Sequence, residues 1–74
     1  MKEVLLYTRK QCPLCDEARA LLELFDVNII EHDIETRDEW QLNYGLMIPV
    51  IVIDREEMYG EQISFEQLNK RLSS

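Results

Sequence analysis

The chain has only two cysteines, and they stand three positions apart in the stretch Cys12-Pro13-Leu14-Cys15. An apolar run at positions 4–8 precedes this stretch and is typical of a buried strand. After it, apolar residues recur at the three- and four-residue spacing of an amphipathic helix. We therefore expect the cysteine pair to occupy the first turn of a helix that follows a strand.

This position would make the two thiols chemically unequal. Residues i and i+3 of a helix lie on one face with Cβ atoms about 5–6 Å apart, so the thiols can join in a disulfide and separate again. The free N–H groups and partial positive charge of the helix N-terminus stabilise a thiolate at Cys12, and Pro13 suits the first helical position because it lacks an N–H. We predict that Cys12 is an exposed nucleophile of low pKa and that Cys15 is the resolving thiol.

Charged residues flank the pair on both sides. Arg9 and Lys10 stand just before Cys12 and would favour its thiolate, although Lys10 could equally be an incidental charge of a solvated loop. Asp16 and Glu17 suit the helix dipole but oppose the thiolate slightly. A disulfide across so short a loop stabilises a fold little, and C-x-x-C beside a strand–helix–strand pattern is typical of redox proteins. Two ordinary buried cysteines in a helix are the alternative interpretation.

Length, charge and hydropathy narrow the classes of function. With 74 residues, of which 46% are hydrophobic and 31% charged, the chain should fold as a single domain over residues 1–74 with a modest core. A net charge of −7 argues against nucleic-acid binding, because phosphate contacts need clustered Lys and Arg. No apolar run approaches the ~20 residues of a membrane span, and the N-terminus lacks a signal-peptide pattern. We therefore expect a cytoplasmic monomer that binds neither membrane nor nucleic acid.

The rest of the chain predicts three more strands and two more helices. The predicted strands cover about residues 3–8, 27–34, 50–53 and 57–59, with a turn at 54–56, and the predicted helices cover about 13–26, 36–45 and 64–72. Thr36 with Glu39, and Ser64 with Gln67, match capping boxes, and Gly45 should stop the second helix. The order β-α-β-α-β-β-α predicts an α/β fold with a parallel N-terminal pair, a C-terminal hairpin and helices on both faces of a four-stranded mixed sheet.

We expect the single histidine and the single tryptophan to have structural roles. We expect His32 to lie at the surface or to be hydrogen-bonded rather than to act as a catalytic base. We expect Trp40 to be a packing residue of the second helix.

The chain as a whole resembles a glutaredoxin of the thioredoxin-fold superfamily. The resemblance rests on the order of elements, on the stretch YTRKQCPLC at residues 7–15 and on Pro49, which opens the third strand. It implies a thioredoxin-like, glutaredoxin-type fold and a dithiol oxidoreductase. In that family the position of Cys12 holds the nucleophile and the position of Cys15 holds the resolving cysteine.

The resemblance also implies where a substrate would bind. Arg9 falls where glutaredoxins carry a lysine that meets the carboxylate of glutathione. Ile48-Pro49 falls at the cis-proline step of the family, and we expect a cis bond that lies beside Cys12 and lets the Ile48 backbone pair with an incoming chain. The substrate-binding residues implied in this way are Arg9, Pro13, Leu14, Ile48, Pro49, Tyr59 and Gly60.

Three departures from the family pattern bear on the substrate. Leu14 replaces an aromatic residue, and Met47-Ile48 replaces threonine-valine. The Gly-Gly-acid segment that receives the α-amino end of glutathione is replaced by Tyr59-Gly60-Glu61-Gln62. The Tyr59 side chain would intrude on that ligand, and the neutral Gln62 or Ser64 would stand where an acid is expected. We therefore expect weak use of glutathione.

The leading hypothesis is a thiol–disulfide oxidoreductase without a bound cofactor. Its substrate would be a disulfide-containing protein or glutathione, and its electrons would come from glutathione or from another dithiol reductant or reductase. One alternative is a metal-binding or iron–sulfur module that uses Cys12, Cys15 and His32, or a cluster that bridges two chains. The other is an interaction domain in which the C-x-x-C stretch is idle.

Overall fold

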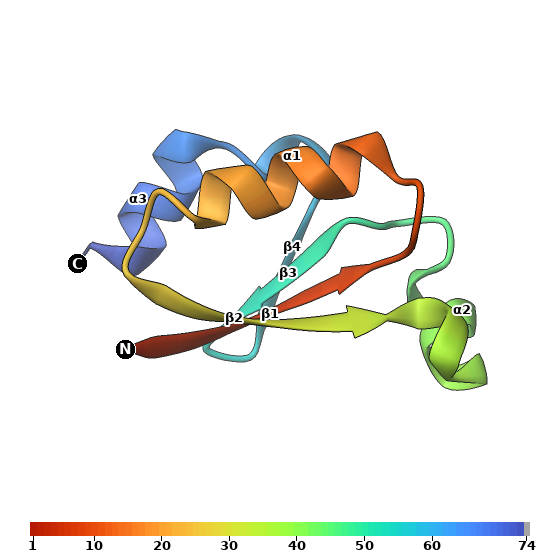
Figure 1. Cartoon of the computed structure of the whole chain (residues 1–74). Coiled ribbons are helices and arrows are strands. Elements are labelled where there is room, and N and C mark those ends of the chain that lie inside the picture. The colour runs from red at the N-terminus through yellow and green to blue at the C-terminus, as the bar shows by residue number, and fades with distance from the viewer. Residues whose placement is uncertain (74) are drawn as a thin grey trace.

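The computed structural model describes residues 1–73 and has the predicted alternation of strands and helices (Figure 1). Its elements are β1 (Lys2–Thr8), α1 (Pro13–Leu22), β2 (Val27–Asp33), the 3-10 helix η1 (Ile34–Thr36), α2 (Asp38–Tyr44), β3 (Val50–Ile53), β4 (Glu56–Tyr59), the 3-10 helix η2 (Gly60–Gln62) and α3 (Phe65–Leu72). The strands form one sheet in the order β2-β1-β3-β4. The predicted fold class is confirmed.

Strand β1 lies inside the sheet and leads directly to the cysteine pair. It pairs in parallel with β2 and antiparallel with β3, and β3 forms an antiparallel hairpin with β4. Helices α1 and α3 cover one face of the sheet, whereas α2 lies against the opposite face near one end (Figure 1). The turn after β1 therefore carries the cysteines from the middle of the sheet onto the first turn of α1.

The main core lies between the sheet and the helices α1 and α3. Alternate residues of each strand point to this face, as the two-residue period of a strand requires. Eight residues, each at most 2% exposed, form this core: Val4, Leu6, Ala18, Leu22, Ile51, Ile53, Met58 and Leu68. Full burial of such a side chain stabilises the fold by about 1.5–3 kcal/mol, so this layer is what holds α1 in place.

The opposite face carries a smaller cluster that is largely aromatic. The Tyr7 ring stacks on Tyr44 at 4.2 Å between centroids and meets Trp40 edge-on at 5.6 Å. Trp40 is thus a packing residue, as predicted. His32 packs between Tyr7 and Trp40, and its buried Nδ1 has no hydrogen-bond partner within residues 1–73. His32 is thus half-buried, and the hydrogen bond expected for it is absent at Nδ1.

The first helix is shorter than its periodicity predicts. It ends at Leu22 and not near position 26. The N–H groups of Leu24 and Phe25 donate to carbonyls only three residues back, which tightens the last turn. Phe25 then packs on Phe65 of α3 at 5.3 Å between ring centroids, so its helical spacing reflects a contact beyond the helix.

The capping box predicted at Thr36 is wrong. The Asp33 carboxylate accepts the N–H of Glu35, and the Thr36 hydroxyl donates to the carbonyl of Asp33. These bonds turn the chain into η1 and end β2 one residue earlier than predicted. Helix α2 then begins after Arg37, whose side chain makes no capping bond within the described residues.

Three other local predictions have mixed outcomes. The box predicted at Ser64 is half confirmed: the Ser64 hydroxyl accepts the N–H of Gln67, but the Gln67 side chain makes no return bond within the described residues. Gly45 ends α2 as predicted, but its φ of −54° is right-handed; the glycine is needed because a Cβ there would lie 2.5 Å from the Gln41 carbonyl oxygen. The turn between β3 and β4 has only two residues, both with positive φ as in a type I′ turn, so the assignment of position 56 to the turn is wrong.

Candidate active site

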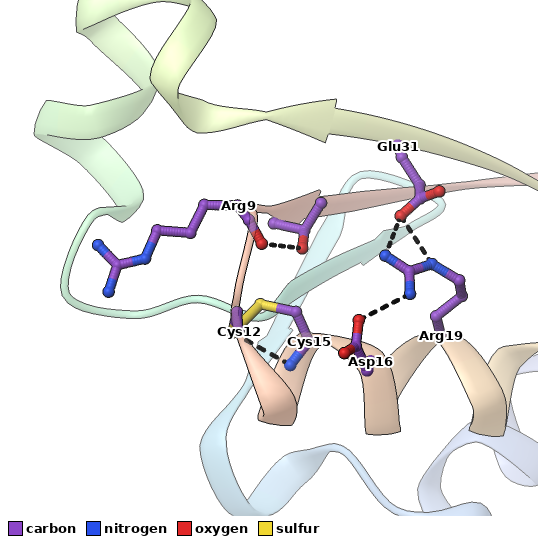
Figure 2. The surroundings of a disulfide bond; sticks show 7 residues. Arg9, Cys12, Cys15, Asp16, Arg19 and Glu31 are labelled. Atoms are coloured by element: carbon purple, nitrogen blue, oxygen red, sulfur yellow. Dashed lines mark hydrogen bonds and ion pairs between the residues drawn. A yellow bond between two sulfur atoms is a disulfide. The ribbon is translucent and has the colours of Figure 1, made fainter.

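The cysteine pair forms a disulfide at the N-terminus of α1 (Figure 2). The two Cα atoms lie 5.2 Å apart. Cys12 is the N-cap residue, and its Sγ accepts the N–H of Cys15 at 3.2 Å. Pro13 is the first helical residue, as predicted. A hydrogen bond to a sulfur favours its ionised form, so this arrangement suits a thiolate at Cys12.

The two sulfurs differ in exposure. Cys15 is fully buried, whereas Cys12 remains partly exposed at the edge of the fold. A substrate arriving from solvent therefore meets Cys12 first. The buried Cys15 is placed to react only with a group already attached to Cys12.

The loop before Cys12 is exposed and basic. Arg9 and Lys10 make no ion pair within the described part of the chain, and Gln11 takes a left-handed φ of 57°. Figure 2 shows the Arg9 side chain extending away from α1. Arg9, Lys10 and Gln11 line two small hollows, one of which is also lined by Glu31 and Asp33 of β2.

A larger groove of about 470 Å³ begins at Leu14, and neither cysteine is among the described residues that line it. It is lined by Leu14, Glu17, Ala18 and Leu21 of α1, by Leu46, Met47, Ile48 and Pro49 before β3, and by Tyr59, Gly60 and Ile63 after it. Five of the seven predicted substrate-binding residues thus meet in one groove, whereas Arg9 and Pro13 do not line it. Leu14 is 62% exposed and Leu46 fully exposed, so the groove offers apolar surface to a partner.

The Ile48–Pro49 bond is cis, as predicted, and both residues line the groove together with Leu14. Its expected place beside Cys12 stays a prediction. The N–H of Ile48 donates to the carbonyl of Tyr44 at 3.1 Å. An incoming chain therefore does not find that N–H free, and the expected backbone pairing is reduced to the Ile48 carbonyl.

The segment at the far wall of the groove is held by its own polar bonds. The N–H of Tyr59 donates to the side-chain oxygen of Gln62 at 3.2 Å. The Ser64 hydroxyl is occupied by its cap bond. Gly60 adopts a left-handed φ of 59°, a conformation that favours glycine.

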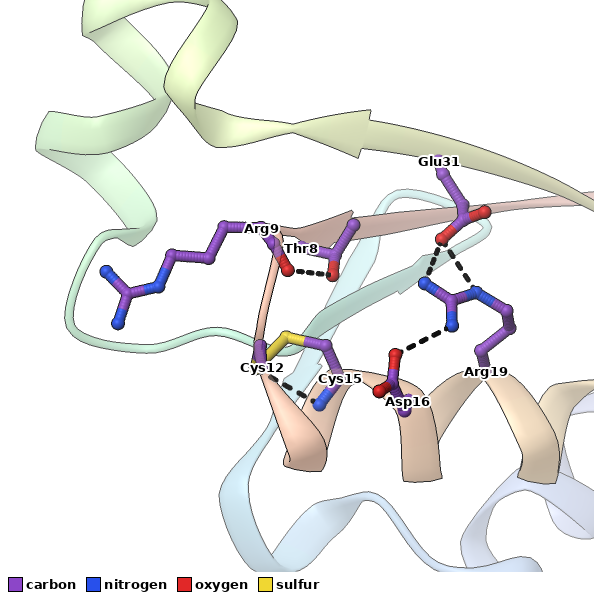
Figure 3. Close-up of polar contacts among 7 residues, drawn as sticks. All are labelled: Thr8, Arg9, Cys12, Cys15, Asp16, Arg19 and Glu31. Carbon is purple, nitrogen blue, oxygen red and sulfur yellow. Dashed lines mark hydrogen bonds and ion pairs between the residues drawn. A yellow bond between two sulfur atoms is a disulfide. The ribbon is translucent and has the colours of Figure 1, made fainter.

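A charged cluster of Asp16, Arg19 and Glu31 lies beside the cysteine pair (Figure 3). Arg19 of α1 contacts Asp16 of the same helix and Glu31 of β2. Sequence reasoning did not single out this cluster. The three-residue spacing of Asp16 and Arg19 was a usable signal, whereas the contact with Glu31 depends on how α1 lies over β2.

Residues 1–73 contain neither a grouping of metal ligands nor a membrane-spanning helix. No three His, Cys, Asp or Glu side chains there are grouped so as to hold a metal ion, and His32 lies in the aromatic cluster. No helix in the same range has the length and apolar character needed to span a membrane.

Comparison with known proteins gives a consistent result. Residues 3–73 match the family described as a glutaredoxin-like domain (DUF836). The chain is similar to the T8A mutant of the thioredoxin-like protein BC3987, with 27% identity and a TM-score of 0.75 over 99% of this chain and 97% of that one. It is also similar to the structural-genomics target protein XcR50 from X. campestris, with 25% identity and a TM-score of 0.83 over 95% of each chain. The glutaredoxin (grx-1) from Archaeoglobus fulgidus shares the fold, with 21% identity and a TM-score of 0.72 over 100% of this chain and 89% of that one.

Proposed function

This chain belongs to the family of glutaredoxin-like domains, and on that premise we propose that it is a thiol–disulfide oxidoreductase. The observation that carries the proposal is the unequal cysteine pair at the start of α1. Cys12 is accessible and its sulfur receives an N–H bond, whereas Cys15 is buried one turn away within disulfide distance. A nucleophile and a resolving thiol need this difference.

The proposed reaction has two exchange steps. The thiolate of Cys12 attacks one sulfur of a substrate disulfide, forms a mixed disulfide and expels the other sulfur as a thiolate. Cys15 loses its proton, attacks the Cys12 sulfur and releases the second substrate thiolate, which takes up a proton. The substrate gains two electrons and two protons, and the chain is left with the Cys12–Cys15 disulfide. A dithiol reductant or a reductase then restores the dithiol, and no bound cofactor takes part.

We propose a protein disulfide as the substrate and only weak use of glutathione. Among the described residues that line the groove, Glu17 is the only charged one, whereas glutathione carries carboxylates and an ammonium group that need charged partners. Loss of one such bond costs about 1.5–3 kcal/mol, or about ten- to a hundredfold in affinity. An extended polypeptide with an apolar side chain near its cysteine matches the Leu14, Leu46 and Tyr59 surface better. We also propose that the protein is a cytoplasmic monomer.

The electron donor provides the test. The oxidised protein would be reduced either by glutathione with glutathione reductase or by a thioredoxin-reductase-type dithiol system, with NADPH consumption measured in the presence of a protein disulfide. We expect turnover with the dithiol system to be about tenfold or more faster. Cys12→Ser is the control and should abolish both rates. Equal rates with the two donors would contradict the proposed preference, and no turnover with either would contradict the proposed function.

A further inference from the structure

Cys12 caps α1, and two opposite charges, Asp16 and Arg19, follow it in the helix. The N–H of Asp16 donates to the carbonyl of the cap residue Cys12 at 3.1 Å, and Asp16 and Arg19 stand three positions apart on one helix face. Asp16 therefore lies between the N-cap sulfur and Arg19. A free carboxylate at this position can turn toward either neighbour, and toward the sulfur its charge would oppose a thiolate.

The structure shows Asp16 turned toward Arg19 (Figure 3). Nη1 of Arg19 donates to Oδ1 of Asp16 at 2.9 Å. Nε of Arg19 donates to Oε1 of Glu31 at 2.8 Å, and Nη2 donates to the same oxygen. Glu31 belongs to β2, so the Arg19 guanidinium is bonded to the neighbouring strand as well as to its own helix.

The pairing with Glu31 makes Arg19 more than a mobile surface charge. The Arg19 side chain is 33% exposed, compared with 70% for Asp16. The hydrogen bond to Glu31, and next that to Asp16, raises the pKa of Arg19 above its ordinary value. An arginine is charged at every pH at which a cysteine titrates, and the two hydrogen bonds to Glu31 hold the Arg19 side chain in this position.

Other charges also surround this side of the cysteine pair. A polar hollow of about 290 Å³ lies here, lined by Thr8, Arg9, Lys10, Gln11, Asp16, Arg19, Glu31 and Asp33. Glu35 of η1 lines the adjoining hollow, and Glu17 lies on the groove side. Asp16 is the residue of this set whose backbone N–H is bonded to Cys12, so the direction of its carboxylate matters most to that sulfur.

We propose that Arg19 is a positioning residue that holds the Asp16 carboxylate toward β2 and away from Cys12, so that the nucleophile stays ionised. This proposal rests on the proposed function, because the position of Asp16 matters to the reaction only if Cys12 is the nucleophile. Arg19 touches neither the sulfurs nor a substrate. It acts through Asp16, and Glu31 acts through Arg19.

The test is a pH profile of Cys12 alkylation in the reduced protein. All variants carry Cys15→Ser, so that Cys12 is the single thiol, and the rate with iodoacetamide is followed from pH 4 to 10. We expect Arg19→Gln to raise the apparent pKa of Cys12 by about half a unit, which slows alkylation about threefold below that pKa. Arg19→Met, which keeps the apolar stem, should behave alike and replaces Arg19→Gln if that variant unfolds.

A double-mutant cycle with Asp16→Asn separates positioning from a simple sum of charges. With Arg19 present, Asp16→Asn should change the rate less than twofold, because the carboxylate is already withdrawn. In the Arg19→Gln background the same change should restore the wild-type rate, and Arg19→Lys should rescue part of the effect. An unchanged rate in Arg19→Gln, or an equal effect of Asp16→Asn in both backgrounds, would overturn the proposal. Alkylation needs no disulfide substrate, so its outcome is independent of whether the proposed reaction occurs.

Discussion

At the scale of single residues, the two sulfurs differ although only two residues separate them. Cys12 sits outside the helix, with an extended backbone and an N–H bond to its sulfur. Cys15 sits inside the first turn and is fully buried. The difference follows from where the helix begins, and Pro13 fixes that start because a proline is favoured at the first helical position. The cap position therefore decides which of the two sulfurs is exposed.

Tyr59 provides a residue-scale prediction about glutathione. Its side chain lines the groove and is 45% exposed, at a place where the resemblance to glutaredoxins implies a glycine. Tyr59→Gly should open the groove and let the backbone approach a small ligand, which raises turnover with glutathione about two- to tenfold. The measurement is the coupled assay with glutathione reductase. Tyr59→Phe, which keeps the ring, is the matched control, and an equal gain in that variant would show that the ring is not the obstacle.

At the scale of elements, the site lies where three connections meet at one end of the sheet. The turn after β1 supplies Cys12 and leads to Cys15 in α1, the segment before β3 supplies Ile48 and Pro49, and the end of β4 with the residue after it supplies Tyr59 and Gly60. These connections are fixed by different layers of the fold. Helix α1 is fixed by the main core, whereas the segment before β3 follows α2 and depends on the aromatic cluster.

One hydrogen bond ties α2 to the sheet and predicts a pH dependence of stability. The Tyr44 hydroxyl donates to Glu57 of β4 at 2.7 Å, and this bond, followed by burial, raises the pKa of Tyr44 above its ordinary value of 10.0. The folded state thus holds the proton more tightly than the unfolded state. The stability contributed by the bond is fully present below pH about 10 and is lost as the pH rises from there toward the raised pKa.

Urea unfolding of the wild type and Tyr44→Phe between pH 8 and 11 measures this effect. Phenylalanine keeps the stacking on Tyr7 and removes only the hydroxyl. At pH 8 the wild type should be more stable by about 1 kcal/mol, and this advantage should shrink above pH about 10. A difference that stays constant up to pH 11 would show that Tyr44 does not hold its proton more tightly when folded.

At the scale of the whole molecule, the parts that could be predicted are those with a local cause. The cysteine stretch, its place after a strand and the cap at Ser64 depend on neighbouring residues, and they are found as predicted. The end of α1 and the start of α2 were mispredicted because Phe25 packs on another helix and Asp33 supplies the turn bonds. Periodicity and capping patterns contain no information about such distant partners.

The site divides in the same way. The cysteine pair could be placed from its spacing alone, and Ile48, Pro49, Tyr59 and Gly60 from the family resemblance. The other groove-lining residues, and the contact of Arg19 with Glu31, arise only when the chain is folded. Pattern reasoning located the cysteine pair but not the surfaces around it, which depend on how the elements pack.

The most direct test of the proposed reaction is to trap its mixed disulfide. Cys15→Ser, reduced and then mixed with an oxidised protein substrate, lacks the resolving thiol and should accumulate a covalent adduct. Mass spectrometry of the digested adduct should place the link at Cys12, and added dithiol should release it. Cys12→Ser is the matched control and should form no adduct. Absence of an adduct in Cys15→Ser, or an adduct of equal yield in Cys12→Ser through the buried Cys15, would contradict the roles assigned to the two cysteines.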